Sequence, residues 1–203
     1  LKKPVVSILT QVIVDKNDIA FKNPTKPIGP YYSKKEMTIL RKKGYVMKKI
    51  NGGYRRVVAS PRPLRIVEAP IIKKLASMNI ITIAAGGGGI PVFKKHGLHG
   101  IDAVIDKDLA SSCLAKSIGA QLLLILTDVP CAYINYGKKN QKELRKLSIK
   151  EAKKLLKEGH FPAGSMGPKI QASIEFAESG GKAIITNFAS LKKAMKGKAG
   201  TIV

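Results

Sequence analysis

One short segment places a lysine between two aspartates at the start of a predicted helix, an arrangement suited to holding phosphate. In residues 105–108, the flanking carboxylates would position Lys107 and keep it charged. Asp108 itself suits a helix start, because a carboxylate favours the positive end of the helix dipole. A plain helix cap with a solvated lysine is the competing interpretation.

A second lysine, Lys169, closes the sequence of residues 164–169. Pro168 is predicted at the first helical position, so Lys169 falls in the first turn, where a cation opposes the dipole. A bound anion would resolve that conflict, because free backbone N–H groups and the lysine would both point at one phosphate. An exposed lysine, tolerated at modest cost, is the alternative.

Glycines and a third lysine add to this set. Gly86, Gly87 and Gly88 follow an apolar predicted strand, and residues without Cβ let backbone N–H groups approach a phosphate closely. The run matches neither the dinucleotide fingerprint nor the P-loop, so a flexible turn is equally open. Residues 23–30 are predicted as a rigid, turn-rich segment whose three prolines would help to aim Lys26, or as a structural surface loop.

The histidines and cysteines indicate no other chemistry. The three histidines form no metal-binding spacing with Cys113 and Cys131, and no Ser-His-Asp arrangement is identifiable. We therefore exclude metalloenzymes and hydrolases. Lysines, a glycine loop, helix starts and an orienting aspartate are the parts that phosphoryl transfer uses.

The elements that must position these residues alternate between helices and continuous apolar strands, which predicts a parallel sheet covered on both faces. In such α/β sheets ligands bind at the carboxyl ends of strands, here after Ala85 and Leu126. Predicted strands are 5–14 (mostly buried), 80–85, 122–126 and 183–187, and predicted helices are 68–78, 108–118, 148–157, 168–179 and 189–195.

Residues 17–63 interrupt this pattern with many Pro and Gly residues. They allow one short helix at 33–43, and a hairpin is predicted from 46–50 and 54–58 around the turn at 51–53. We interpret the segment as a small, basic, partly β insertion in a larger domain.

Composition narrows the class of protein. The 203 residues suit one domain, and the longest apolar run, 80–93, is too short to span a membrane. Two cysteines cannot build a disulfide framework, so a reduced, cytoplasmic setting is predicted. The net charge of +24 indicates either nucleic-acid binding or a lysine-rich solvated surface; the low aromatic content of 5% and the scattered basic residues favour the surface.

Taken together, these segments resemble the carbamate kinases of the amino acid kinase family. The resemblance covers essentially the whole chain, with its motifs in the family's order. The matching segments are 10–12, 14–15, 23–30, 55–58, 60–61, 66–68, 86–91, 103–110, 124–130, 136–138, 159–161, 164–169 and 200–201.

The resemblance implies an α/β/α sandwich around a largely parallel sheet, formed by residues 1–203, with residues 17–63 as a protruding lid subdomain. It implies reversible phosphoryl transfer between MgATP and carbamate, giving ADP and carbamoyl phosphate, and in arginine fermentation the formation of ATP. Mg²⁺ would accompany the nucleotide. A homodimer is expected, with no membrane and no nucleic-acid partner.

The resemblance also implies roles for individual residues. Lys107 and Lys169 would bridge the transferred phosphoryl group, with Asp108 holding the lysines. Lys26 would reach over the substrate, and the glycines of the loop would face the phosphates. The nucleotide pocket would be lined by Thr127, Asp128, Tyr136, Met166, Gly167 and Pro168.

The chain departs from the family at its start. The family's first strand and its Gly-Gly-Asn loop have no counterpart, and with no initiator Met we expect the chain to be the later part of a longer sequence. A nucleic-acid-binding protein or an inactive binding relative are the alternatives; the retained Lys107, Asp108 and Lys169 argue against the inactive relative. Cys131, near the proposed nucleotide pocket, is either a reactive thiol or, as we predict, a structural cysteine.

Overall fold

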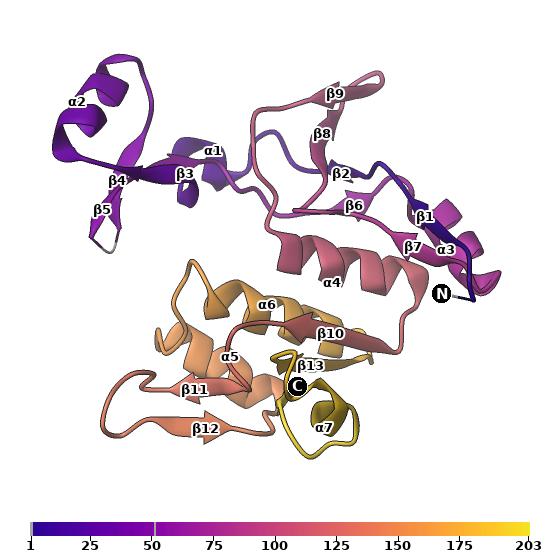
Figure 1. Ribbon diagram of the computed structural model, residues 1–203. Coiled ribbons are helices and arrows are strands. Elements are labelled where there is room, and N and C mark those ends of the chain that lie inside the picture. The colour runs from indigo at the N-terminus through magenta and orange to yellow at the C-terminus, as the bar shows by residue number, and fades with distance from the viewer. Residues whose placement is uncertain (1, 51) are drawn as a thin grey trace.

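The computed structural model describes residues 2–50 and 52–203 as a mixed α/β protein (Figure 1). Helix α4 (Lys107–Ile118) crosses the middle of the molecule and packs against helix α6 (Met166–Ala177). An N-terminal part lies on one side of this helix pair and a C-terminal part on the other, while a third part projects from the molecule (Figure 1). The described strands form five small sheets.

The N-terminal part is built on two parallel strand pairs, β1 with β7 and β2 with β8. Strands β6 and β9 add antiparallel to β2 and β8. Val12, Ile66 and Ile105 belong to the buried apolar cluster that joins these strands to α3 and α4. The elements are β1 (Val5–Ser7), β2 (Gln11–Ile13), β6 (Arg65–Ile66), α3 (Ala69–Ser77), β7 (Ile81–Ile83), β8 (Ile90–Lys94) and β9 (Leu98–Gly100).

Residues 5–14 form two strands with different partners, where one mostly buried strand was predicted. The strand is interrupted around Thr10. The Thr10 hydroxyl donates to the Ile8 carbonyl at 3.0 Å and accepts from the Ala85 N–H at 2.8 Å. Leu9 is consequently 79% exposed. The prediction was wrong because apolar composition alone does not show a buried side-chain hydrogen bond that redirects the backbone.

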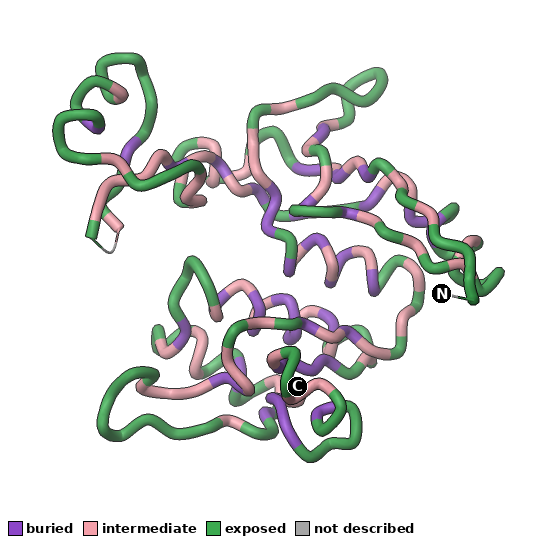
Figure 2. Tube along the Cα trace, viewed as in Figure 1, coloured by how far each residue is buried: buried purple, intermediate pink, exposed green. Residues whose placement is uncertain are grey.

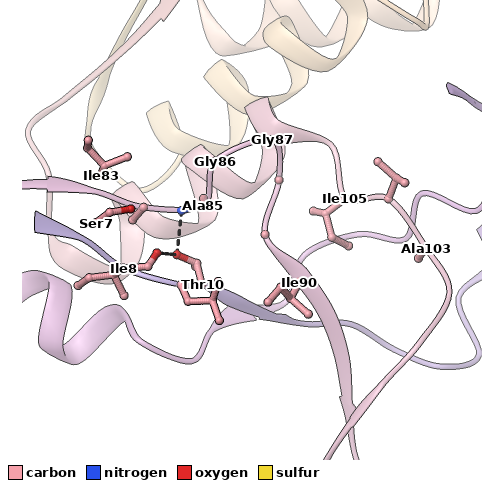
Figure 3. A pocket seen from close by; sticks show the side chains of 15 residues that line it. Ser7, Ile8, Thr10, Ile83, Ala85, Gly86, Gly87, Ile90, Ala103 and Ile105 are labelled. Atoms are coloured by element: carbon pink, nitrogen blue, oxygen red, sulfur yellow. Dashed lines mark hydrogen bonds between the residues drawn. The ribbon is translucent and has the colours of Figure 1, made fainter. Parts of the chain in front are cut away.

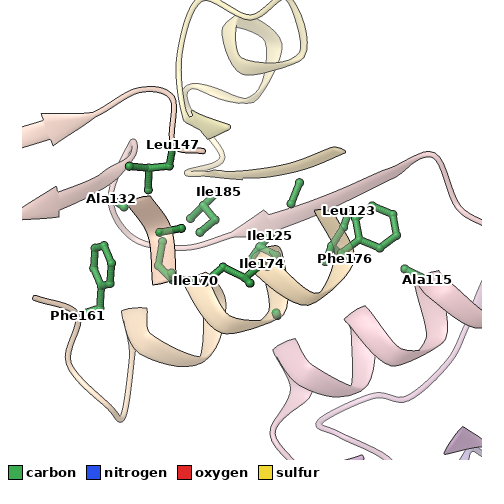
Figure 4. Close-up of a cluster of buried hydrophobic side chains, with 13 residues drawn as sticks. Ala115, Leu123, Ile125, Ala132, Leu147, Phe161, Ile170, Ile174, Phe176 and Ile185 are labelled. Carbon is green, nitrogen blue, oxygen red and sulfur yellow. The ribbon is translucent and has the colours of Figure 1, made fainter. Parts of the chain in front are cut away.

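The C-terminal part has its core between α6 and the parallel pair of β10 and β13. Ile170 and Ile174 of α6 belong to the same buried cluster as Ile125 and Ile185 of those strands (Figure 4). Strand β14 adds antiparallel to β13, and β11 and β12 form a separate hairpin. The elements are β10 (Leu122–Leu126), β11 (Ala132–Ile134), β12 (Lys142–Leu144), α5 (Ile149–Lys157), β13 (Lys182–Thr186), α7 (Leu191–Met195) and β14 (Thr201–Ile202).

The third part projects from the rest and is mostly exposed (Figures 1 and 2). Its strands form an antiparallel sheet in the order β3-β5-β4, and a capping box between Ser33 and Glu36 starts its helix α2. The elements are α1 (Ile19–Lys22), β3 (Lys26–Tyr32), α2 (Lys34–Lys42), β4 (Met47–Ile50) and β5 (Gly53–Val58).

These bounds confirm the helix predicted at 33–43 and the hairpin strands predicted at 46–50 and 54–58. Asn51 of the predicted hairpin turn lies outside the described residues. The prediction of a turn-rich segment at 23–30 was wrong for its second half, because strand β3 pairs there with β5. The pairing shifts its register between Ile28 and Tyr32.

The remaining predicted helices and strands are confirmed with small differences at their ends, and the parallel pairs confirm the α/β class. The sequence did not indicate the β8-β9 and β11-β12 hairpins. Among the helices of the described residues, none has the length and apolar character needed to cross a membrane.

Candidate active site

Two aspartates at the start of α4 each hold a lysine from a distant segment. Asp106 is the N-cap: its Oδ1 accepts hydrogen bonds from the backbone N–H groups of Asp108 at 2.9 Å and Leu109 at 3.3 Å. Its Oδ2 accepts from Nζ of Lys26 at 2.5 Å. Oδ2 of Asp108 accepts from Nζ of Lys169 at 2.9 Å. The start of α4 therefore gathers lysines from β3 and α6.

Lys107 lies between these aspartates as the exposed first residue of α4. Within the described chain, no carboxylate forms an ion pair with it. The prediction that its flanking carboxylates hold this lysine was wrong, because successive helical residues point about 100° apart. The same geometry leaves the ammonium group of Lys107 free to meet a ligand.

Lys169 is the fourth residue of α6, which begins at Met166. The helix was predicted to begin at Pro168, and that prediction was wrong by two residues. The N–H groups of a first helical turn have no acceptor within the helix, so proline is tolerated at its third position as well as at its first. The Lys169 side chain is 10% exposed and that of Asp108 is 9% exposed. A buried pair of this kind links the first turns of α4 and α6.

The glycine loop lines a cavity of about 500 Å³ at the edge of the N-terminal part (Figure 3). Gly86 and Gly87 are exposed, and the Gly87 N–H donates to no acceptor within the described chain. Gly88 is buried against the segment that leads into α4, since a Cβ on this residue would lie 2.2 Å from the Ile105 carbonyl oxygen. The loop thus runs beside the residue that precedes the α4 cap, with one backbone donor open to the cavity.

A second cavity, of about 190 Å³, adjoins the start of α6. Of the residues predicted for the nucleotide pocket, Thr127, Asp128, Tyr136 and Met166 line it, whereas Gly167 and Pro168 lie beyond Met166 in the helix and do not. The remaining lining residues were not predicted for this pocket, although four of them, Val129, His160, Phe161 and Ser165, lie in segments that match the family. The remaining lining residues are Val129, Tyr133, His160, Phe161, Pro162 and Ser165.

Tyr133 and Tyr136 form one wall of this second cavity, with ring centroids 5.6 Å apart. Burial, followed by a hydrogen bond with Cys131, raises the pKa of Tyr133 to about 12. Burial likewise raises the pKa of the Cys131 thiol, which is fully buried. Both groups stay protonated near neutral pH, which supports the structural role predicted for Cys131.

Cys113, on α4, is the other free cysteine of the chain. Burial is the main cause that raises the pKa of its thiol, and the nearby Glu175 adds to the effect. A protonated, buried thiol is a poor nucleophile. Neither cysteine therefore competes with the lysines and aspartates as the centre of the chemistry.

The buried pair connects two helix starts, and each of them lies next to one of the cavities. The first cavity reaches Ile105 at the start of α4, and the second reaches Met166 at the start of α6. The ion pair of Asp108 and Lys169 joins those two helix starts. Helix N-termini attract anions, so each of these two helix starts can bind a phosphate group.

Comparisons with known proteins show the family to which the chain is similar. The model of the amino acid kinase family matches residues 32–187. The chain is 52% identical over 205 residues to carbamate kinase from Thermoplasma acidophilum, covering 100% of this chain and 67% of the relative. It is 50% identical over 207 residues to carbamate kinase from Pyrococcus furiosus, covering 100% of this chain and 66% of that relative.

A solved structure gives the same result for the fold. Carbamate kinase from Giardia lamblia bound to AMP-PNP superposes with a TM-score of 0.86 at 45% identity, covering 98% of this chain and 65% of that one. The chain thus spans about two thirds of the length of these relatives. The family match, these identities and the shared α/β sandwich lead to one assignment. The chain belongs to the amino acid kinase family and, within it, to the carbamate kinases.

Proposed function

We propose that the protein catalyses reversible phosphoryl transfer between MgATP and carbamate, giving MgADP and carbamoyl phosphate. The observation that carries the proposal is the buried pair of Lys169 and Asp108, which joins the helix starts at the two cavities. In the direction that forms ATP, a β-phosphate oxygen of ADP bonds to phosphorus as the bond from phosphorus to the carbamate oxygen breaks. No proton has to move to or from the protein.

The proposed role of the protein is to place and neutralise charge. Lys107 and Lys169 contact the equatorial oxygens of the transferred phosphoryl group, where negative charge spreads in the transition state. Asp108 acts through Lys169, whose ammonium group it holds at 2.9 Å. The backbone of Gly86, Gly87 and Gly88 faces the phosphate from the first cavity.

The second cavity is proposed to hold the nucleotide, because four of the residues that the family resemblance assigns to the nucleotide pocket line it. The Giardia lamblia relative, which was solved with AMP-PNP, supports a nucleotide as the ligand. Mg²⁺ enters as part of the nucleotide complex. Within residues 2–50 and 52–203, no group of three or more His, Cys, Asp or Glu side chains could hold a metal ion. We propose that phosphate oxygens and water supply most of the ligands of the Mg²⁺ ion, as is usual for magnesium in kinases.

Residues 17–63 are proposed to act as a lid that carries Lys26 over the carbamate side.

We also infer a homodimer and a place in ATP formation during arginine breakdown, both from the family resemblance. Size-exclusion chromatography with light scattering tests the dimer. The measured molar mass should be twice that of the chain.

The decisive experiment is ATP formation from carbamoyl phosphate, ADP and Mg²⁺, followed by luciferase, with the intact mass of the sample recorded. The wild-type protein is expected to form ATP, and Lys169→Ala is expected to lose this activity. ATP formation that is equal in both proteins would contradict the role of Lys169. Its absence in a folded wild-type protein would contradict the proposed function.

A further inference from the structure

Asp106 uses both of its carboxylate oxygens, and each serves a different part of the molecule. Oδ1 accepts the two backbone N–H groups that cap α4, which fixes the aspartate side chain. Oδ2 accepts the ammonium group of Lys26, 80 residues away in the sequence. The Asp106 side chain is 8% exposed and that of Lys26 is 27% exposed. The fixed partner is therefore the aspartate, and the lysine is the group that it holds.

Lys26 needs such a partner because of where it stands. It is the first residue of β3, where the projecting part leaves the body of the molecule. Its ammonium group lies at the N-terminus of α4, whose partial positive charge repels a cation. Lys107, in the first turn of the same helix, adds a further positive charge. The Asp106 carboxylate offsets both repulsions.

We infer that Asp106 is a positioning residue, which holds Lys26 of the projecting part over the phosphate-binding start of α4. The inference rests on the proposed function, because Lys26 is assigned there to the carbamate side of the site. It adds to that function a residue that does not itself touch the substrate. The ion pair also connects the base of the projecting part to the start of α4.

The variant Asp106→Asn separates the two uses of the side chain. Asparagine caps a helix about as well as aspartate, so the bonds to Asp108 and Leu109 are kept while the charge is lost. We expect kcat/KM for carbamoyl phosphate to fall about a hundredfold. Lys26→Met is expected to cause a similar fall, and the double variant only about twofold more, because both changes remove one interaction.

A cap at another helix supplies the matched control. Ser148 caps α5 through a capping box with Glu151, far along the chain from the site. Ser148→Ala is expected to lower the melting temperature and to leave kcat/KM for carbamoyl phosphate unchanged. If Asp106→Asn behaves like Ser148→Ala, or if the losses of Asp106→Asn and Lys26→Met multiply in the double variant, the positioning role is wrong.

A chemical readout distinguishes failure of this inference from failure of the proposed function. Limited acetylation of lysines with acetic anhydride, read by mass spectrometry, reports how freely each amine reacts. Lys26 is expected to react several-fold faster in Asp106→Asn than in the wild-type protein, while exposed Lys48 of β4 reacts equally in both. An unchanged rate at Lys26 overturns the inference whether or not the protein forms ATP.

Discussion

Nζ of Lys169 lies 2.9 Å from Oδ2 of Asp108, and both side chains are about nine-tenths buried between the first turns of α4 and α6. A buried charge that loses its partner is strongly destabilising, whereas an exposed lysine is not. Lys107, one residue before Asp108, is exposed and has no carboxylate partner in the described chain. The two lysines assigned to the phosphoryl group therefore differ in what they contribute to stability.

We predict that Lys169→Ala and Lys107→Ala share a kinetic defect and differ in stability. In both variants kcat should fall by about 10²–10³-fold, with a small change in KM for ADP. The reason is that the contact of each lysine with the phosphoryl group strengthens in the transition state. Lys169→Ala should also cost about 3–5 kcal/mol in free energy of unfolding. Lys107→Ala should change that free energy by no more than about 0.5 kcal/mol. Urea denaturation and steady-state kinetics measure both effects, and equal stability losses would contradict the structure.

The glycine loop allows a second paired prediction. Gly88 has φ near +143°, and a Cβ there would lie 2.2 Å from the Ile105 carbonyl oxygen. Gly88→Ala should therefore lower the free energy of unfolding by roughly 3 kcal/mol or more. A Cβ on Gly87 meets no atom within 4 Å, so Gly87→Ala should keep the melting temperature. It should still weaken use of carbamoyl phosphate, because a methyl group beside the free N–H crowds the phosphate.

Thermal denaturation followed by kinetics separates these two glycine variants. An unchanged KM for carbamoyl phosphate in Gly87→Ala would remove the loop from the phosphate site. A normal melting temperature in Gly88→Ala would show that the loop does not pack against Ile105 as described.

The spacing of residues did not predict which lysine each aspartate holds. Of the pairings that the family resemblance implies, the one between Asp108 and Lys169 is confirmed. Lys107 was assigned to its sequence neighbours, yet the aspartates bind Lys26 and Lys169, which are 80 and 61 residues away. Local patterns carry no information on such contacts. Strand β3 was missed because Pro27 and Pro30 favour turns; a strand at the edge of its sheet tolerates proline, since one side needs no ladder hydrogen bonds.

Thr10, which lines the first cavity, gives a third prediction, on the stability of the protein. Its buried hydroxyl accepts the Ala85 N–H at 2.8 Å, and Ala85 has a positive φ of 62°, which is unusual for a residue with a Cβ. Thr10→Val would leave that N–H without an acceptor. The free energy of unfolding, measured by urea denaturation, should therefore fall by about 1–3 kcal/mol. Thr10→Ser keeps the hydroxyl and serves as the control, so it should retain most of the stability. Loss of stability in Thr10→Ser alone would contradict the role of the hydroxyl.

The carboxylate of Asp106 makes stability depend on pH in a defined window. Burial acts to raise its pKa, but the hydrogen bond and charge of Lys26 and the two backbone N–H groups outweigh burial, so the pKa lies below the ordinary value of 3.8. A group with a lowered pKa in the folded state stabilises fully above its unfolded pKa, and that contribution is lost as pH falls through the folded pKa. The window therefore begins near pH 3.8 and extends below it.

Urea denaturation of the wild-type protein and Asp106→Asn across pH 3 to 6 tests this window, because the variant has no titrating group at this position. We expect the wild-type protein to be the more stable of the two by a constant amount above about pH 5, and that difference to shrink as pH falls below 3.8. A difference that stays constant to the lowest pH would show that Asp106 does not hold Lys26 in the folded protein. A difference that grows on acidification would mean that the pKa is raised, and that burial outweighs the ion pair.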